Sequence, residues 1–230
     1  MVGVIGAMKI EVETIINLMD NKESEKIGRV TFVKGTLDGK DIVIAECGIG
    51  KVAAAICTQT MILKYKPDCI INTGVGGSLS KELKICDVVL GETLVQHDMD
   101  TSPIGDPIGL ISGLGIIDIP ADKKVNDLLE KATKKAKSSC KVVRGKIASG
   151  DQFIADSGKK DFIVKNFGAI CCEMEGAAIA QTCYSAKVPF GVVRAISDCA
   201  DGSSHMDYSD FLPKAAKIAS GIIRNFVKEW

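Results

Sequence analysis

Four short segments of the chain bring acidic, basic or hydroxyl side chains to places where strands are expected to end. They lie around Glu11, around Asp151, at Glu173–Glu175 and at Arg194–Asp198. An arginine within an apolar strand usually has a carboxylate partner, because an unpaired buried charge is costly. Carboxylates held in a partly buried site can donate or accept protons during a reaction. Together the four segments bring several acids, one arginine and one aromatic side chain to neighbouring strand ends, which predicts an active site.

The overall charge excludes partners that need a basic surface. The chain has 230 residues, with 29 Lys and Arg against 29 Asp and Glu, so its formal net charge is zero. A protein that binds nucleic acid by neutralising phosphates usually has a net basic domain. Hydrophobic residues make up 46% of the chain, which excludes an intrinsically disordered protein. We therefore expect a globular protein that binds no nucleic acid.

The nine cysteines are expected to be buried, reduced thiols. Their number is odd, they form no C-x-x-C pair, and only His97 and His205 accompany them. A zinc site needs several such ligands at close spacing, so no metal is expected. The run MVGVIGAM is too short for a signal peptide, and no apolar run approaches the roughly 20 residues of a membrane span. These features predict a cytoplasmic protein with no membrane contact.

Strands and helices are expected to alternate along the sequence. Apolar runs rich in β-branched residues predict strands, and apolar residues three or four positions apart predict helices. Asp38-Gly39 is a favourable hairpin turn. The expected strands are Val2–Ile5, Val30–Val33, Asp41–Glu46, Cys69–Asn72, Asp87–Val95, Val142–Ser149, Ala169–Cys172 and Val188–Ile196, and the expected helices are Met8–Met19, Lys51–Leu63, Ala121–Lys137, Glu175–Ala186 and Ser209–Val227.

This order predicts an α/β fold in which a central mixed, mainly parallel twisted sheet is flanked by helices, giving three layers. Residues 1–230 contain no repeat and no linker, so a single domain is expected. In open α/β sheets, ligands bind at the carboxyl ends of the strands. In this chain those ends are polar or rich in glycine: Gly6, Gly48, Gly74, His97, Gly150, Glu173 and Ser197-Asp198.

Two nucleotide-binding motifs are matched incompletely near residue 50. Gly48–Ala53 fits the dinucleotide fingerprint G-x-G-x-x-A, and Asp68 follows about twenty residues later. Asp68, however, precedes the next expected strand instead of ending it. Gly50-Lys51 resembles the end of a phosphate-binding P-loop, which has the pattern G-x-x-x-x-G-K-[ST]. The first glycine of that pattern is replaced here by Ala45, and the Ser or Thr after the lysine is replaced by Val52. We expect a tight glycine turn that opens a helix, and no nucleotide cofactor.

The same polar segments resemble those of the 5′-methylthioadenosine/S-adenosylhomocysteine nucleosidases, in the purine nucleoside phosphorylase-like superfamily. The resemblance is carried by GAMKIEV, SGDQFI, CEMEGAAIA and VVRAISDCADGSSH, and extends to GIGKVAAA, INTGVGGSL and HDMDTSPIG. It runs from about residue 2 to residue 227. It implies the nucleoside phosphorylase-like fold for the whole chain.

The resemblance implies hydrolysis of the N-glycosidic bond of an adenine thionucleoside, which releases adenine and a 5-thio-substituted ribose. By similarity, Asp198, oriented by Ser197, is the acid that protonates N7 of adenine. Glu11 is the base that activates a water, and Arg194 lies near that water. Glu175 is implied to bind the ribose hydroxyls, and its charge would stabilise a cationic sugar. No metal or organic cofactor is implied.

Further residues are implied to line the substrate pocket. Phe153 would stack on adenine, and the backbone of Ile154 would bind the edge of the base. The sugar and the thioalkyl tail would be contacted by Met8, Met174, Ile49 and Tyr208. The family often has a serine where this chain has Val75, so no hydroxyl is expected there to hold the water.

The resemblance also implies a homodimer. The segment Thr101–Pro120, rich in Ile, Gly and Pro, is the candidate for part of its interface and for closing the partner's pocket. Three alternatives stay open: a phosphate-dependent nucleoside phosphorylase, an aminodeoxyfutalosine nucleosidase, and a nucleoside-binding protein without catalysis. A phosphorylase would need a cationic or hydroxyl-lined phosphate site, and both Val75 and the negative charge of Glu11 argue against one.

Overall fold

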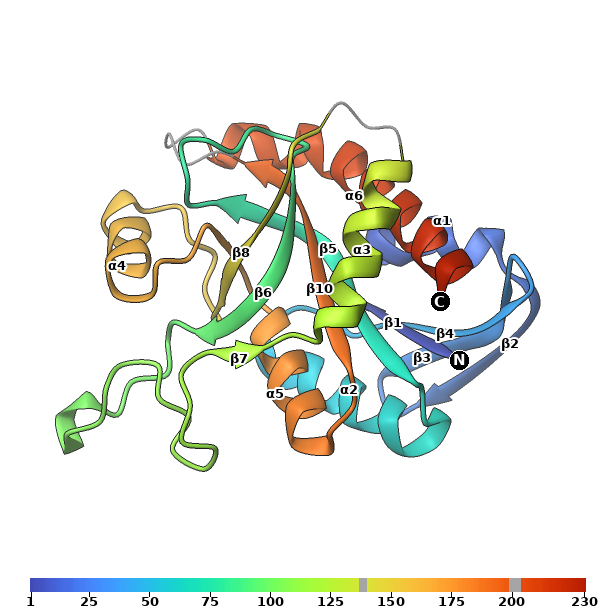
Figure 1. The fold of residues 1–230 in the computed structure, drawn as a ribbon, viewed down its shortest axis with the longest axis horizontal. Helices are drawn as coiled ribbons and strands as arrows, with labels where there is room; N and C mark the ends of the chain where they lie inside the picture. Colours follow the sequence, from blue (N-terminus) through green and yellow to red (C-terminus); the bar gives the residue numbers. More distant parts are fainter. Residues whose placement is uncertain (137–139, 199–203) are drawn as a thin grey trace.

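Helices cover both faces of one mixed sheet in the computed structural model (Figure 1). The structure describes residues 1–136, 140–198 and 204–230, and for residues 204–211 it describes the backbone alone. Its strands are β1 (Val2–Gly6), β2 (Asp20–Ile27), β3 (Val30–Leu37), β4 (Lys40–Glu46), β5 (Cys69–Ser78), β6 (Val88–Gln96), β7 (Ile119–Pro120), β8 (Val142–Ser149), β9 (Cys171–Glu173) and β10 (Phe190–Asp198). Its helices are α1 (Lys9–Leu18), α2 (Lys51–Tyr65), α3 (Lys123–Lys135), α4 (Ser157–Phe167), α5 (Gly176–Ala186) and α6 (Ser204–Glu229).

The predicted α/β architecture is confirmed. Apolar residues of α1, α3 and α6 pack together on one face of the sheet, and those of α2 and α5 pack on the other (Figure 1). At the centre of the sheet, β4, β1, β5 and β10 are parallel neighbours, and every residue of β1 and β10 is buried. Strands buried on both faces are mainly apolar, which is why these runs carry no alternation, although β10 also buries Arg194.

One part of the sheet closes on itself. β10 pairs with both β5 and β6, while β8 and β9 connect β6 back to β5. The short strand β9 makes this closure, since it pairs in parallel with β8 and antiparallel with β5. The closure brings the carboxyl ends of β8, β9 and β10 close to the glycine-rich carboxyl end of β5.

The expected strand Cys69–Asn72 is too short, because β5 continues through the glycine cluster to Ser78. Its glycines permit close approach by neighbouring groups. A Cβ atom at Gly76 would lie 2.7 Å from Cys171 Sγ, closer than real Cβ atoms come. The cluster is therefore part of the sheet and not a loop that ends the strand.

Three elements were not predicted from the sequence: β2, α4 and the short strand β7, which lies within the segment expected to be a loop. β2 is charged and exposed along most of its length, and it forms the sheet edge by pairing with β3. Helix α4 begins at a capping aspartate, Asp156, whose side chain accepts a hydrogen bond from the Lys159 amide. The expected hairpin between β3 and β4 is present, with positive φ at both Asp38 and Gly39.

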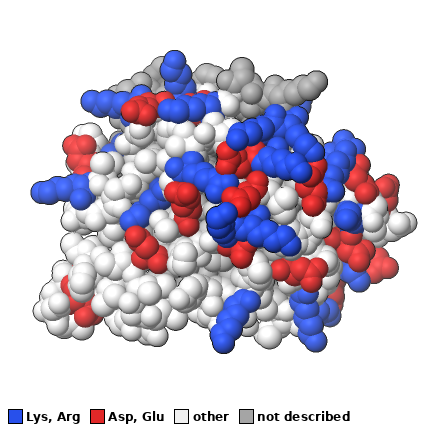
Figure 2. Space-filling model, in the orientation of Figure 1, with Lys and Arg blue, Asp and Glu red and all other residues white. Residues whose placement is uncertain are grey.

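Basic and acidic side chains are intermingled on the molecular face in Figure 2. Many of them pair along and beside α3, as Arg144 does with Asp127 and Glu130. Such pairing agrees with the balanced charge of the sequence. Of the helices in the described parts of the chain, none is long and apolar enough to cross a membrane.

Candidate active site

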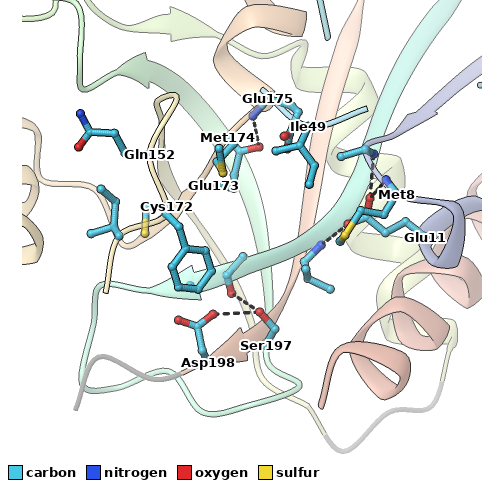
Figure 3. Close-up of a pocket in the computed structure, with 16 residues that line it drawn as sticks. Met8, Glu11, Ile49, Gln152, Cys172, Glu173, Met174, Glu175, Ser197 and Asp198 are labelled. Atoms are coloured by element: carbon cyan, nitrogen blue, oxygen red, sulfur yellow. Dashed lines mark hydrogen bonds between the residues drawn. The ribbon is translucent and has the colours of Figure 1, made fainter. Parts of the chain in front are cut away.

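A cavity of about 410 Å³ lies where the ends of β1, β9 and β10 meet the glycine-rich part of β5 (Figure 3). This volume is within the usual range for small-molecule sites. Four carboxylates face the cavity, and its described lining contains no lysine, arginine or histidine. The lining residues are Ala7, Met8, Glu11, Ile49, Val75, Gly76, Gly77, Gln152, Phe153, Ile154, Cys172, Glu173, Met174, Glu175, Ser197 and Asp198.

Glu11 is held in the first turn of α1 by backbone amides. Its Oε2 accepts hydrogen bonds from the amides of Ala7 at 2.8 Å and Met8 at 2.9 Å, and its Oε1 accepts one from Val75 at 3.1 Å. Burial raises the pKa of Glu11 above its ordinary value, although the charge of Arg194 and these amides act in the opposite direction. A carboxylate of fixed orientation and raised pKa is suited to act as a base.

Gly74 allows the guanidinium of Arg194 to approach Glu11. A Cβ atom at this position would lie 2.5 Å from Glu11 Oε1 and 3.3 Å from Arg194 Nη1. The space beside Gly74 is therefore bounded by a hydrogen-bond acceptor, Glu11 Oε1, and a hydrogen-bond donor, Arg194 Nη1. A larger residue there would displace the carboxylate of Glu11.

Arg194 is almost completely buried, with 1% of its surface exposed. Its Nη2 donates to Asn72 Oδ1 and forms a salt bridge with Glu173 Oε2. Nη1 is 3.2 Å from the carbonyl of Val193, and Nε has no hydrogen-bond partner among the described residues. The guanidinium therefore keeps donor capacity beyond its ion pair.

Glu173 is the carboxylate that neutralises Arg194. Its Oε1 accepts from the Ser149 hydroxyl, and its Oε2 accepts from the amides of Glu175 at 3.0 Å and Gly176 at 2.7 Å. Burial alone would raise the pKa of Glu173, but Arg194 and these donors lower it overall. Glu173 is therefore a structural anion at neutral pH, and its partners also fix the backbone that presents Glu175.

Glu175 is buried at the start of α5 and faces the cavity. Its Oε1 accepts a hydrogen bond of 2.8 Å from the amide of Gly50, the N-cap residue of α2. Burial, and then the negative charge of Glu173, raise the pKa of Glu175 to about 7. Its protonation state therefore changes near neutral pH.

Asp198 lies at the end of β10, on a different side of the cavity from Glu11 (Figure 3). Its side chain is buried, and its Oδ1 accepts a hydrogen bond of 3.0 Å from the Ser197 hydroxyl. A Cβ atom at Gly77 would lie 3.0 Å from Asp198 Oδ2, so the glycine leaves room for this carboxylate. The cavity thus has carboxylates on separated walls.

Ten of the twelve residues singled out from the sequence line the cavity, and they come from six segments of the chain. They are Met8, Glu11, Ile49, Val75, Phe153, Ile154, Met174, Glu175, Ser197 and Asp198. Arg194 lies behind this wall, bonded to Glu173, and the side chain of Tyr208, like that of His205, is outside the described residues.

The sequence interpretation did not include Glu173 among the site residues, although it noted the pair of carboxylates at Glu173–Glu175. The signal that could have found it is Arg194, because a buried arginine requires a carboxylate partner. Cys172 and Gln152 also line the cavity, and nothing in their sequence pattern distinguishes them. In the described residues, no group of three His, Cys, Asp or Glu side chains could hold a metal ion.

Replacing Arg194 by methionine should lower the free energy of unfolding by about 3–5 kcal/mol, because Glu173 would be left buried without its counter-charge. Urea denaturation measures this loss. Arg224, whose guanidinium pairs with Asp38 on the surface, provides the matched control, and Arg224→Met should have a much smaller effect. Equal losses in the two variants would contradict a special role for the buried pair.

Comparison with known proteins gives matches along the whole chain. The sequence model of the phosphorylase superfamily matches residues 1–228. A 5′-methylthioadenosine/S-adenosylhomocysteine nucleosidase of Haemophilus influenzae (strain 86-028NP) is 40% identical over 227 residues, which cover 98% of this chain and 97% of that relative.

Two solved structures are similar in both fold and length. The nucleosidase of the same name from Neisseria meningitidis, in complex with methylthio-immucillin-A, gives a TM-score of 0.95 at 36% identity and covers 100% of this chain and 99% of its own. A futalosine hydrolase of Helicobacter pylori strain 26695 gives a TM-score of 0.94 at 36% identity, and the match covers 100% of this chain and 97% of that hydrolase. The chain therefore belongs to the phosphorylase superfamily and, within it, to the family of the 5′-methylthioadenosine/S-adenosylhomocysteine nucleosidases.

Proposed function

We propose that the protein hydrolyses the N-glycosidic bond of 5′-methylthioadenosine and S-adenosylhomocysteine, releasing adenine and the 5-thio-substituted ribose. The observation that carries this proposal is the charge of the cavity, which presents four carboxylates and no cationic side chain in its described lining. Such a cavity favours a sugar that becomes positively charged as the bond breaks. The same charge disfavours phosphate as the attacking group, which argues against a phosphorylase.

Attack by water is assigned to the side of Glu11. A water beside Gly74 would be within reach of Glu11 Oε1 and of the Arg194 guanidinium, which flank that space. Glu11 would accept the proton as the water attacks C1′ of the ribose, and Arg194 would orient the water. Val75 offers only its backbone amide to Glu11 here, so the hydroxyl common in relatives is not needed for this step.

Departure of adenine is assigned to the side of Asp198. Adenine leaves readily only when its N7 gains a proton as the bond breaks. Asp198 would supply this proton, and the hydroxyl of Ser197 would keep its carboxyl group in position, consistent with their hydrogen bond of 3.0 Å. The separation of Asp198 from Glu11 across the cavity agrees with attack and departure on opposite faces of the sugar.

The remaining cavity residues would bind the substrate. Phe153, about half exposed, would stack on adenine, and the backbone of Ile154 would bind the edge of the base. Glu175 would accept hydrogen bonds from the ribose hydroxyls and stabilise the cationic sugar when ionised. The sugar and the thioalkyl tail would be contacted by Met8, Met174, Ile49 and Tyr208.

A futalosine derivative is a second candidate substrate, because a futalosine hydrolase is as similar in fold as the thionucleoside hydrolases. It would be cut by the same groups, since it carries its substituent at the 5′ position.

Incubation of the protein with 5′-methylthioadenosine, S-adenosylhomocysteine and aminodeoxyfutalosine in phosphate-free buffer, with chromatography of the released adenine, tests the proposal and ranks the substrates. Absence of adenine release from all three would overturn the proposed function.

A cytoplasmic homodimer, built from one domain per chain, is part of the proposal. Three large apolar residues on α2, Val52, Ile56 and Leu63, are well exposed and lie on one stripe of the helix. Ile104, in the segment proposed as partner contact, is 82% exposed. Exposed apolar groups that lie along one stripe indicate an interface, and a second copy of the chain is the occupant that the family resemblance favours.

Glu11→Gln and Asp198→Asn should each reduce the rate of adenine release by about 10²–10⁴-fold, because each removes a proton-transfer group. Steady-state assays with 5′-methylthioadenosine measure the rates. Glu13→Gln, on an exposed position of the same helix, is the matched control and should keep the wild-type rate. Near-wild-type turnover of either test variant would mean that its assigned role is wrong.

The dependence of kcat/KM on pH should show an acid limb well above the ordinary pKa of a glutamate. The pKa of Glu175 is about 7, so this residue gains a proton as the pH falls through that value, and burial raises the pKa of Glu11, so it gains a proton at a higher pH than an exposed glutamate does. A protonated Glu11 cannot act as a base, and a protonated Glu175 no longer stabilises positive charge. Hence kcat/KM should fall as the pH is lowered from about 8 to about 5. A flat profile over that range would contradict these roles.

A charge on the exposed stripe of α2 should dissociate the proposed dimer. Ile56→Glu places a carboxylate at its centre, and sedimentation velocity should then detect a monomer where the wild-type protein sediments as a dimer. Val164→Glu, at a partly exposed apolar position on α4, is the control and should leave the sedimentation coefficient unchanged. Wild-type protein that sediments as a monomer would contradict the dimer.

A further inference from the structure

A ring of charged hydrogen bonds lies beside the cavity and is not used by the proposed reaction. The amide of Lys51 donates to Asp151 Oδ1 at 2.7 Å, and the amide of Asp151 donates to Asp98 Oδ2 at 2.9 Å. The ammonium group of Lys51 closes the ring on Asp98 Oδ1 at 2.6 Å and also contacts Gln96 Oε1 at 3.1 Å. Each residue of the ring therefore bonds to both others.

The ring joins three segments that are far apart in the sequence. Lys51 begins α2, Asp98 follows β6, and Asp151 follows β8. Two neighbouring amides at the start of α2 have different partners, since that of Gly50 holds Glu175 and that of Lys51 holds Asp151. The turn before α2 thus contacts both Glu175, the carboxylate assigned to the ribose, and the loop that runs from Asp151 to Phe153, the side chain assigned to adenine.

Gly50 makes this arrangement possible. Its φ is +97°, a conformation that other residues rarely adopt, and a Cβ atom there would lie 2.9 Å from Asp151 Oδ1. Gly50, noted in the sequence as part of a possible phosphate-binding motif, therefore serves the approach of a carboxylate.

Among the described residues, two apolar side chains of the cavity walls beside the ring are largely exposed. Phe153, two residues after Asp151, is 48% exposed, and Ile49, two residues before Lys51, is 61% exposed. Within the ring, Asp151 is exposed, but the ion pair is better shielded, because the side chains of Lys51 and Asp98 are only 19% and 18% exposed. Charge-assisted hydrogen bonds in such a partly buried place are stronger than those between exposed groups.

We propose that Asp98 is a positioning residue for substrate binding, which acts through Lys51 and Asp151 to hold the Phe153 loop against the turn that carries Ile49. This inference rests on the proposed function, because it assigns adenine to Phe153 and the thioalkyl tail to Ile49. The ring sets the distance between these two walls before the substrate arrives. It does not touch Glu11 or Asp198, which are held by α1, β5 and β10.

Loss of the ring should therefore weaken binding more than it slows the chemical step. In Asp98→Asn, one side-chain oxygen becomes an amide group that cannot accept a hydrogen bond from Lys51 or from the Asp151 amide. KM for 5′-methylthioadenosine should rise about tenfold or more, while kcat stays within about threefold of wild type. The Kd for free adenine, measured by isothermal titration calorimetry, should rise by a similar factor.

Three further variants separate positioning from loss of the fold. Asp151→Asn alters an exposed side chain of the ring and should show the same rise in KM with an unchanged melting temperature. The double variant Lys51→Met, Asp98→Asn should have a KM close to that of each single variant, because each already breaks the ring. Lys64→Met removes an ion pair of 2.8 Å with Glu25 at the other end of α2 and should leave KM unchanged.

Four results would overturn the proposal: an unchanged KM in Asp98→Asn and Asp151→Asn, a loss of kcat without a change in KM, additive effects in the double variant, or an equal rise in KM in Lys64→Met. The calorimetric titration needs no turnover. Wild-type protein that binds adenine but releases none from the nucleosides would overturn the proposed reaction, and the variants would still test the positioning. Wild-type protein that does not bind adenine would overturn both.

Discussion

One buried guanidinium, that of Arg194, sets the charges of the whole site. The negative charges of Glu173, Glu175 and Glu11 raise its pKa, although burial acts against them. Of these three carboxylates only Glu173 forms a direct ion pair with it, and only Glu173 has a lowered pKa. Glu11 and Glu175 share the same region without such a partner, and their pKa values are raised. The three glutamates beside this single cation thus differ in role: Glu173 is a structural anion, Glu11 has a raised pKa, and Glu175 has a pKa of about 7.

The backbone makes this concentration of charge possible. Gly74 leaves space between Glu11 and Arg194, Gly77 leaves space for Asp198, and Gly50 lets a carboxylate approach the start of α2. Amides supply most of the donors to Glu11, and the partial closure of the sheet brings β9 and β10 to β5. Main-chain groups of rigid elements therefore position Glu11 and contribute to holding Glu173 and Glu175.

Much of this arrangement could be predicted from the sequence. Polar groups at strand ends indicated the place of the site, and the apolar runs Val2–Ile5 and Val188–Ile196 predicted two strands that lie at the centre of the sheet. The full length of β5 could not be predicted, because glycine-rich sequence favours a loop unless the close approach of Cys171 and Glu11 is known. β2 was missed because its charged sequence has no strand pattern and depends on pairing with β3. The role of Glu173 and the ring of Lys51, Asp98 and Asp151 depend on contacts between distant segments, which no spacing in the sequence encodes.

The central claim is that this cavity favours attack by water on a sugar that becomes cationic, and that it excludes phosphate. The most direct measurement is mass spectrometry of the sugar product formed from 5′-methylthioadenosine in phosphate buffer. Our account predicts free 5-methylthioribose in an amount equal to the released adenine, with no dependence of the rate on phosphate. A sugar 1-phosphate formed in proportion to adenine would contradict it, because the described cavity lining offers four carboxylates and no cation to hold phosphate.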